Sequence, residues 1–164
     1  MINYFPDKNK YKAAFLYILN KLGKIEGKKK AYKLFYFLNF DYYEAYEKPF
    51  TGETYVALPM GPAPRYFDSV ADELIEEGSI EIKKLRKMSY HENDTVIFSP
   101  KKKTNFKFTK EEQNMLNRII KIYGNKTGKD LEKLSHNQAP YSAVNLYDVI
   151  PYEFTFYRDT PNLK

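Results

Sequence analysis

Residues 51–64 read TGETYVALPMGPAP, and they separate two segments that have strong helical periodicity. Pro59, Pro62 and Pro64 each fix φ and bias the preceding residue away from the α region, whereas Gly61 permits a turn or a close backbone approach. The stretch is therefore predicted to be a rigid connector that sets the geometry of the helices on either side. Gly61 and Pro62 form its predicted structural turn.

Two helices are predicted before this connector. Asp7 is a candidate N-cap for a helix over about residues 8–22, which ends at Gly23. A second helix over about residues 28–46 begins after Gly27. Both segments repeat apolar residues with a period near 3.6, so each is predicted to face a core on one side.

After the connector, the pattern predicts one more helix and a small hairpin. The helix covers about residues 64–77, with apolar residues inward and carboxylates outward. Residues 79–84 alternate and residues 95–98 are β-branched and aromatic, which is typical of paired strands. The turn between them falls on His91-Glu92-Asn93-Asp94.

The next boundary is the clearest in the chain. Thr109 followed by Glu112 forms a capping box for a helix that ends at Gly124. Before it, Phe106 and Phe108 are interpreted as a third short strand or as an apolar lead-in to that helix.

The remainder of the chain is predicted to contain a short helix, a loop and a packed C-terminal stretch. Thr127 with Asp130 repeats the capping arrangement, residues 135–141 follow as a loop, and residues 146–164 form an aromatic extension packed on the body. The fold class is α+β, predominantly α-helical, with about five helices and one antiparallel hairpin. Residues 1–164 are interpreted as one domain.

Composition limits the classes of protein that this chain can represent. Cysteine is absent, which excludes disulfides, thiolate zinc sites and cysteine nucleophiles. No stretch approaches the roughly 20 apolar residues that span a bilayer, and the N-terminal residues lack a signal peptide's apolar region. We therefore expect a soluble, cytoplasmic protein without a membrane partner.

The formal net charge of +6 would suit a polyanionic partner. Only four of the 27 cationic residues are Arg, and Lys is a hydrated point charge without the planar fork that reads bases. Lysine clusters at 28–30 and 101–103 are interpreted as solvated surface or as a site for an anionic partner. A nucleic-acid-binding regulator, such as an autorepressor, remains the alternative function.

No catalytic constellation is found in the sequence. Phosphate-loop and dinucleotide fingerprints are missing, and two histidines, His91 and His136, are too few for a histidine-rich metal site. Ser135 lies next to His136, but adjacent side chains do not generally converge as a nucleophile and its base. A carboxylate site stays open. We expect no enzymatic activity and no cofactor.

Three segments are distinctive as a set. They are Lys33-Leu34-Phe35-Tyr36-Phe37, then Lys48-Pro49-Phe50 through Tyr55 and Ala57 to Gly61-Pro62, and finally Phe108 through Leu134-Ser135-His136 to Pro140-Tyr141. Together they resemble the Panacea, or SocA-like, domain of bacterial and phage antitoxins, over roughly residues 8–145. Met60 and Ala63 replace residues usual in that family, and Tyr141 stands where the family prefers Trp.

The resemblance implies a compact, mainly helical antitoxin of a type II toxin–antitoxin system. Such a protein would bind and neutralise a cognate toxin encoded beside it, and some members of the family deliver the toxin to a Clp protease instead. Specificity would then depend on surface residues rather than on the shared turn. The residues near the matching segments are the candidate partner contacts: Lys33, Tyr55, Tyr66, His136 and Tyr141.

Overall fold

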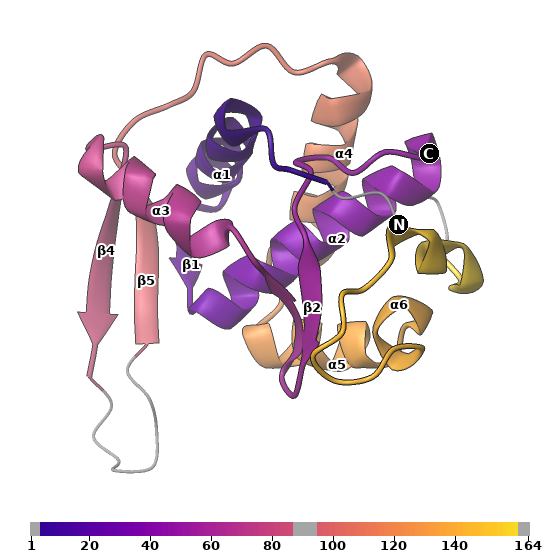
Figure 1. The fold of residues 1–164 in the computed structure, drawn as a ribbon. Helices are drawn as coiled ribbons and strands as arrows, with labels where there is room; N and C mark the ends of the chain where they lie inside the picture. Colours follow the sequence, from indigo (N-terminus) through magenta and orange to yellow (C-terminus); the bar gives the residue numbers. More distant parts are fainter. Residues whose placement is uncertain (1–3, 87–94, 161–164) are drawn as a thin grey trace.

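The computed structural model describes residues 4–86 and 95–160 (Figure 1). Within those ranges the helices are α1 Lys8–Leu22, α2 Lys28–Tyr46, α3 Phe67–Glu76, α4 Lys110–Tyr123, α5 Gly128–His136, α6 Ala139–Ser142 and the 3₁₀-helix η1 Tyr152–Tyr157. The strands are β1 Ile25–Glu26, β2 Tyr55–Leu58, β3 Gly61–Pro64, β4 Ile80–Leu85 and β5 Thr95–Pro100. The predicted helix-dominated α+β class is confirmed, with seven helices in the described residues where about five were expected.

Helix α2 runs through the middle of the molecule (Figure 1). It contacts α4, α5, η1 and β3, and most of its residues are buried. The sequence predicted one apolar face for this helix. Its buried residues instead lie nearly all round it, so neighbouring elements cover the helix on every side. Even its polar residues Asn39 and Asp41 are excluded from solvent.

The stretch that was predicted to be a rigid connector forms a β-hairpin between α2 and α3, which was not predicted. Strands β2 and β3 pair antiparallel, with Leu58 opposite Gly61 and a turn at Pro59 and Met60. The close approach expected at Gly61 is present, since a Cβ there would lie 2.9 Å from Cε of Lys33, and its φ of +104° is one that favours glycine. Three prolines in fourteen residues argue against a strand, which is why the hairpin was not predicted.

The pairing pattern explains how the prolines are tolerated in β3. The N–H of Ala57 donates to the carbonyl of Asp148 at 2.9 Å, and the carbonyl of Ala57 accepts from Tyr147 at 2.6 Å. Ala57 therefore directs both backbone groups away from β3. Pro62 lies directly opposite Ala57. Because Ala57 accepts no hydrogen bond from β3, the missing N–H of Pro62 costs the pairing nothing.

The second sheet confirms the other predicted hairpin. Its strand order is β1–β5–β4, with β4 and β5 antiparallel over their length. The predicted turn at 91–94 lies outside the described residues. The short strand β1 was not predicted, and Phe106 and Phe108 form no strand, which leaves the lead-in interpretation.

The predicted helix boundaries agree with the structure where a side chain caps the helix. The side chain of Asp7 accepts from the N–H of Lys10, and both capping boxes, at Thr109 and Thr127, are formed. Helix α3 begins three residues later than predicted because Pro64 belongs to β3. The predicted loop at 135–141 instead contains the end of α5 and most of α6.

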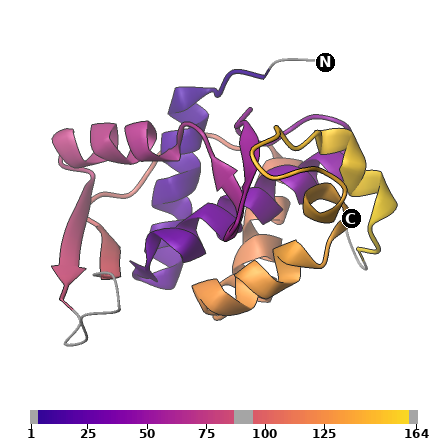
Figure 2. The ribbon, with the colours of Figure 1, turned by 60° about the horizontal axis from the view of Figure 1, so that its bottom comes forward.

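The segment after α6 lies beside β2, on the side away from β3 (Figure 2). The N–H of Ile150 donates to the carbonyl of Tyr55 at 2.8 Å, and the ring of Tyr152 is buried. This segment thus covers the edge of β2 that faces away from β3. Among the described residues, no helix combines the length and apolar character needed to span a bilayer.

Candidate partner-binding site

The side chain of Lys33 joins α2 to the hairpin. Lys33 is 2 % exposed, and its Nζ donates to the carbonyl oxygen of Pro62 at 2.8 Å. Burial lowers the pKa of Lys33 to about 8, although the carboxylate of Glu132 opposes that shift. The buried amino group of Lys33 is therefore a specific link between these two elements.

Gly61 allows the hairpin to approach that lysine. A Cβ at this position would lie 2.9 Å from Cε of Lys33 and 3.2 Å from Cδ2 of His136. Together with its φ of +104°, this leaves no room for a larger residue. Gly61 thus brings side chains from α2 and α5 together around one backbone position.

His136 and Tyr141 complete the arrangement. Their rings stack with centroids 4.5 Å apart and an interplanar angle of 9°. The hydroxyl of Tyr141 donates to the carbonyl of Leu58 at 2.7 Å, which ties α6 to the end of β2. We call Lys33, Gly61, Pro62, His136 and Tyr141 the signature cluster. They come from α2, the hairpin, α5 and α6.

Neighbouring polar groups do not form a catalytic pair. The hydroxyl of Ser135 donates to the backbone carbonyl of Glu132 at 2.9 Å, consistent with the prediction that it does not serve His136. The carboxylate of Glu132 pairs with Lys29 at 2.8 Å. Nε2 of His136 is buried and has no hydrogen-bond partner among the described residues.

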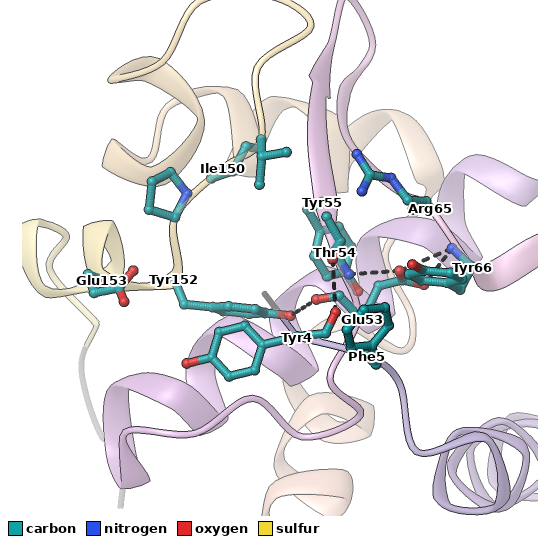
Figure 3. A pocket seen from close by; sticks show the side chains of 12 residues that line it. Tyr4, Phe5, Glu53, Thr54, Tyr55, Arg65, Tyr66, Ile150, Tyr152 and Glu153 are labelled. Carbon is teal, nitrogen blue, oxygen red and sulfur yellow. Dashed lines mark hydrogen bonds between the residues drawn. The ribbon is translucent and has the colours of Figure 1, made fainter. Parts of the chain in front are cut away.

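Tyr55 and Tyr66 lie apart from the signature cluster and line a pocket of about 190 Å³ (Figure 3). Tyr55 is 1 % exposed and forms part of its floor, whereas Tyr66 is half-buried. The five candidate contact residues therefore divide between two places. The buried Lys33 and Tyr55 support their surroundings, while the half-buried Tyr66, His136 and Tyr141 retain exposed area.

Glu53 is the central polar group beside this pocket. Its carboxylate accepts from the hydroxyl of Tyr11 at 2.7 Å, from the N–H of Thr54 at 2.8 Å and from the N–H of Tyr66 at 3.0 Å. Burial raises the pKa of Glu53, and these hydrogen bonds oppose the rise. The carboxylate thereby fixes the position at which α3 begins.

Sequence reasoning missed Glu53, Arg65 and Tyr152, all of which line the pocket. The sequence signal that could have indicated Glu53 is its position as a lone carboxylate between Gly52 and a β-type run. Tyr152 gave none, because its partner is the backbone carbonyl of Glu53 far away in the sequence, at 2.6 Å.

A second buried acid was also missed. The carboxylate of Asp41 is fully buried and pairs with Arg118 and with Nη2 of Arg158, the latter at 2.5 Å. Arg158 also donates to the side chain of Gln138 at 2.9 Å. This network holds the C-terminal segment against α2 and the residue before α6. The sequence signal for this buried acid is the position of Asp41 inside the aromatic run FLNFDYY.

The lysine cluster at 28–30 is engaged within the molecule. Lys28 lies 3.5 Å from Asp68, Lys29 pairs with Glu132, and Nζ of Lys30 donates to the carbonyl of Gly124 at 2.7 Å. These lysines join the start of α2 to α3, α5 and the end of α4. Their charges are therefore partly satisfied without an external anion.

The fold and the signature cluster define a helix-dominated α+β protein whose helices are joined through one proline-rich hairpin. The sequence model described as "Antitoxin SocA-like, Panacea domain" matches residues 32–141, more than half of the chain, so the protein belongs to the SocA-like, Panacea-domain antitoxin family. The match begins just before Lys33 and ends at Tyr141. A search of curated proteins found no match, and a search of solved structures found none either.

Proposed function

We propose that this antitoxin neutralises a cognate toxin encoded by a neighbouring gene, by direct protein–protein binding and without catalysing a reaction. The observation that supports the proposal is the convergence of the signature cluster. Residues from four separate elements of the family-matched region meet around Gly61, and they meet through internal bonds rather than around a reaction site.

The cluster fixes a surface that a partner can contact. Met60, at the tip of the hairpin, is 58 % exposed, and Leu134, on α5, is 39 % exposed. Strand β3 and α5 contact each other, so these apolar side chains belong to packed neighbouring elements. Met is an adaptable apolar side chain that is enriched in protein interfaces, and the exposed Leu134 adds apolar area on a neighbouring element.

Polar groups near the two candidate places have structural partners within the protein. Ser135 and His136 are not hydrogen-bonded to each other, and the buried carboxylates of Glu53 and Asp41 are occupied by structural donors. Within residues 4–86 and 95–160, no group of three metal-binding side chains is found.

Co-expression with the neighbouring open reading frame tests this function. We expect that frame to arrest growth alone, and growth to recover when the antitoxin is co-expressed, with the two proteins co-purifying in a fixed ratio. A harmless neighbour, or one that remains toxic beside soluble antitoxin, would contradict the proposal. Measuring the toxin's half-life with and without Clp protease separates masking from proteolytic delivery, since only delivery shortens it.

Nucleic-acid binding is less well supported than toxin binding. In helix-turn-helix proteins a recognition helix lies in the major groove, close to the phosphates. Here α3 carries Asp68, Asp72, Glu73 and Glu76 and has no Lys or Arg. Phosphates would repel that helix. A promoter-shift assay at low salt is expected to show no specific complex.

A further inference from the structure

We propose that the pocket beside Glu53 receives one lysine or arginine side chain of the partner protein. The inference rests on the proposed function, because it names the chemistry of one contact that the toxin would make. The pocket lies where residues 4–5, the two ends of the hairpin and residues 149–153 meet (Figure 3).

The size of the pocket fits a single side chain. Its volume of about 190 Å³ is below the roughly 300–1,000 Å³ typical of pockets for cofactors and other whole small molecules. Interface anchors, by contrast, are single side chains inserted into pockets of the partner. The pocket is therefore suited to one projecting residue of a protein.

Aromatic rings dominate the walls. Tyr4, Phe5, Tyr66 and Tyr152 line the pocket, and Tyr55 forms part of its floor. The rings of Tyr4 and Tyr152 are held edge to face, with centroids 5.4 Å apart. Aromatic faces attract a cation electrostatically, and the attraction strengthens when water is excluded.

The charges around the pocket favour the same ligand. Glu53 and Glu153 supply two carboxylates, and Arg65 supplies one guanidinium group. Arg65 and Glu153 are exposed to solvent, which screens them, whereas Glu53 is fully buried. A buried charge acts through a lower effective dielectric, so the field of Glu53 outweighs that of Arg65.

The hydrogen bonds of Glu53 favour its ionised form and oppose the rise in its pKa that burial causes. Oε1 accepts from the N–H groups of Thr54 and Tyr66, and Oε2 accepts from the hydroxyl of Tyr11 and from the same N–H of Tyr66. The backbone N–H groups can only donate, so they stabilise a carboxylate rather than a protonated carboxyl group. The group therefore presents negative charge beside the rings.

The segments that form the walls of the pocket fit a role in binding specificity for the partner protein. Residues 53–55 and 65–66 lie within the family-matched region, whereas residues 4–5 and 149–153 lie outside it. The pocket therefore combines walls from the family-matched region with walls that this chain supplies from outside it.

The free protein allows a test that does not depend on the toxin. We would titrate it with n-butylammonium, propionate and p-cresol, following the side-chain NMR signals of Tyr4, Tyr66 and Ile150. We expect n-butylammonium alone to shift all three with a saturable, millimolar affinity that weakens with salt. Stronger binding of propionate or p-cresol, or no saturable binding of n-butylammonium, would overturn the proposed chemistry.

A variant of Arg65 tests whether the pocket prefers a cation or an anion. Arg65→Glu removes the opposing cation, so we expect n-butylammonium to bind about two- to fivefold more tightly, the size of an exposed charge effect. Lys129→Glu makes the same charge change on α5, outside the pocket, and should leave the affinity unchanged. Weaker binding by the Arg65 variant would show that the site prefers anions.

The same variants connect the pocket to the toxin. We expect Arg65→Glu to tighten binding of the co-purified toxin and Glu153→Lys to weaken it, each by about two- to fivefold in calorimetry. Unchanged toxin affinity in both variants would show that the toxin does not use the pocket. If the neighbouring protein does not bind at all, the proposed function fails, whereas the n-butylammonium titration still tests the pocket.

Discussion

The Nζ atom of Lys33 donates a hydrogen bond to the carbonyl oxygen of Pro62 across 2.8 Å, in a place closed to solvent. Proline has no N–H, so Pro62 leaves the pairing of the hairpin undisturbed while its carbonyl points towards α2. The lysine thereby fixes the hairpin on the central helix. A family-signature lysine that looks like a surface residue in the sequence is part of the core.

Gly61→Ala should destabilise the protein by about 2–4 kcal/mol, because the new Cβ combines an unfavourable positive φ with contact against Lys33 and His136. Gly23→Ala is the matched control, since Gly23 has φ +83° but no atom within 4 Å of the added Cβ. It should cost about 1 kcal/mol. Urea unfolding of both variants measures the difference, and equal losses would show that the close approach contributes nothing.

Gly61→Val should impair folding and toxin neutralisation together, since its branched side chain meets the same neighbours. Thermal unfolding and growth rescue by co-expression measure the two effects. Full rescue by a variant with an unchanged Tm would show that glycine is not required at position 61.

Lys33 should make stability rise with pH in the alkaline range. Burial lowers its pKa from 10.5 to about 8, so between these values the unfolded chain binds the proton that the folded protein has lost. This contribution is present above pH 10.5 and is lost as pH falls through about 8. Relative to Lys33→Met, the wild type should gain about 2–3 kcal/mol across that window.

The difference between wild type and Lys33→Met isolates this residue, because the buried tyrosines titrate in both proteins. Glu132 and Lys29 are the charged groups that act on Lys33, and both are retained in the variant. Urea unfolding at pH 7.5, 9 and 10.5 provides the measurement. A constant difference across the three pH values would rule out the lowered pKa.

Asp41→Asn should destabilise the protein by about 3–5 kcal/mol, because it leaves the guanidinium group of Arg158 buried without its main counter-charge. Glu26→Gln breaks the exposed pair with Lys24 and should cost less than about 1 kcal/mol. Chemical unfolding compares the two variants. Similar small losses in both would show that the buried network is solvated.

Met60→Asp and Leu134→Asp should abolish neutralisation while changing stability by less than about 0.5 kcal/mol, as expected for exposed positions. Ile122→Asp, on α4, is the control, since this side chain is 40 % exposed and belongs to another element. Growth rescue and Tm are measured for all three. Loss of rescue by the Ile122 variant alone would place the toxin surface on α4.

Local signals predicted the elements whose ends carry a cap. Asp7, Thr109 and Thr127 each satisfy backbone N–H groups a few residues away, so a sequence pattern identifies them without the rest of the fold. The hairpin β2–β3 could not be predicted in this way. Its prolines are permitted only because Ala57 directs its backbone bonds to Asp148 and Tyr147.

The residues of the candidate site also separate into those that the sequence indicated and those that it did not. Sequence similarity grouped Lys33, Gly61, His136 and Tyr141, and the structure places them in contact through Pro62 and Leu58. The pocket beside Glu53 had no comparable signal, since its walls come from three distant segments.

The sequence by itself determined the helix-dominated class, the capped helix ends and the antitoxin family, because periodicity, caps and family motifs depend on residues close together in the chain. Only the tertiary structure decided that residues 51–64 form a hairpin, that Lys33 is buried and that Glu53 borders an aromatic pocket. Those properties depend on which distant backbone groups and rings surround a residue, and burial then sets its charge, its hydrogen bonds and its accessibility.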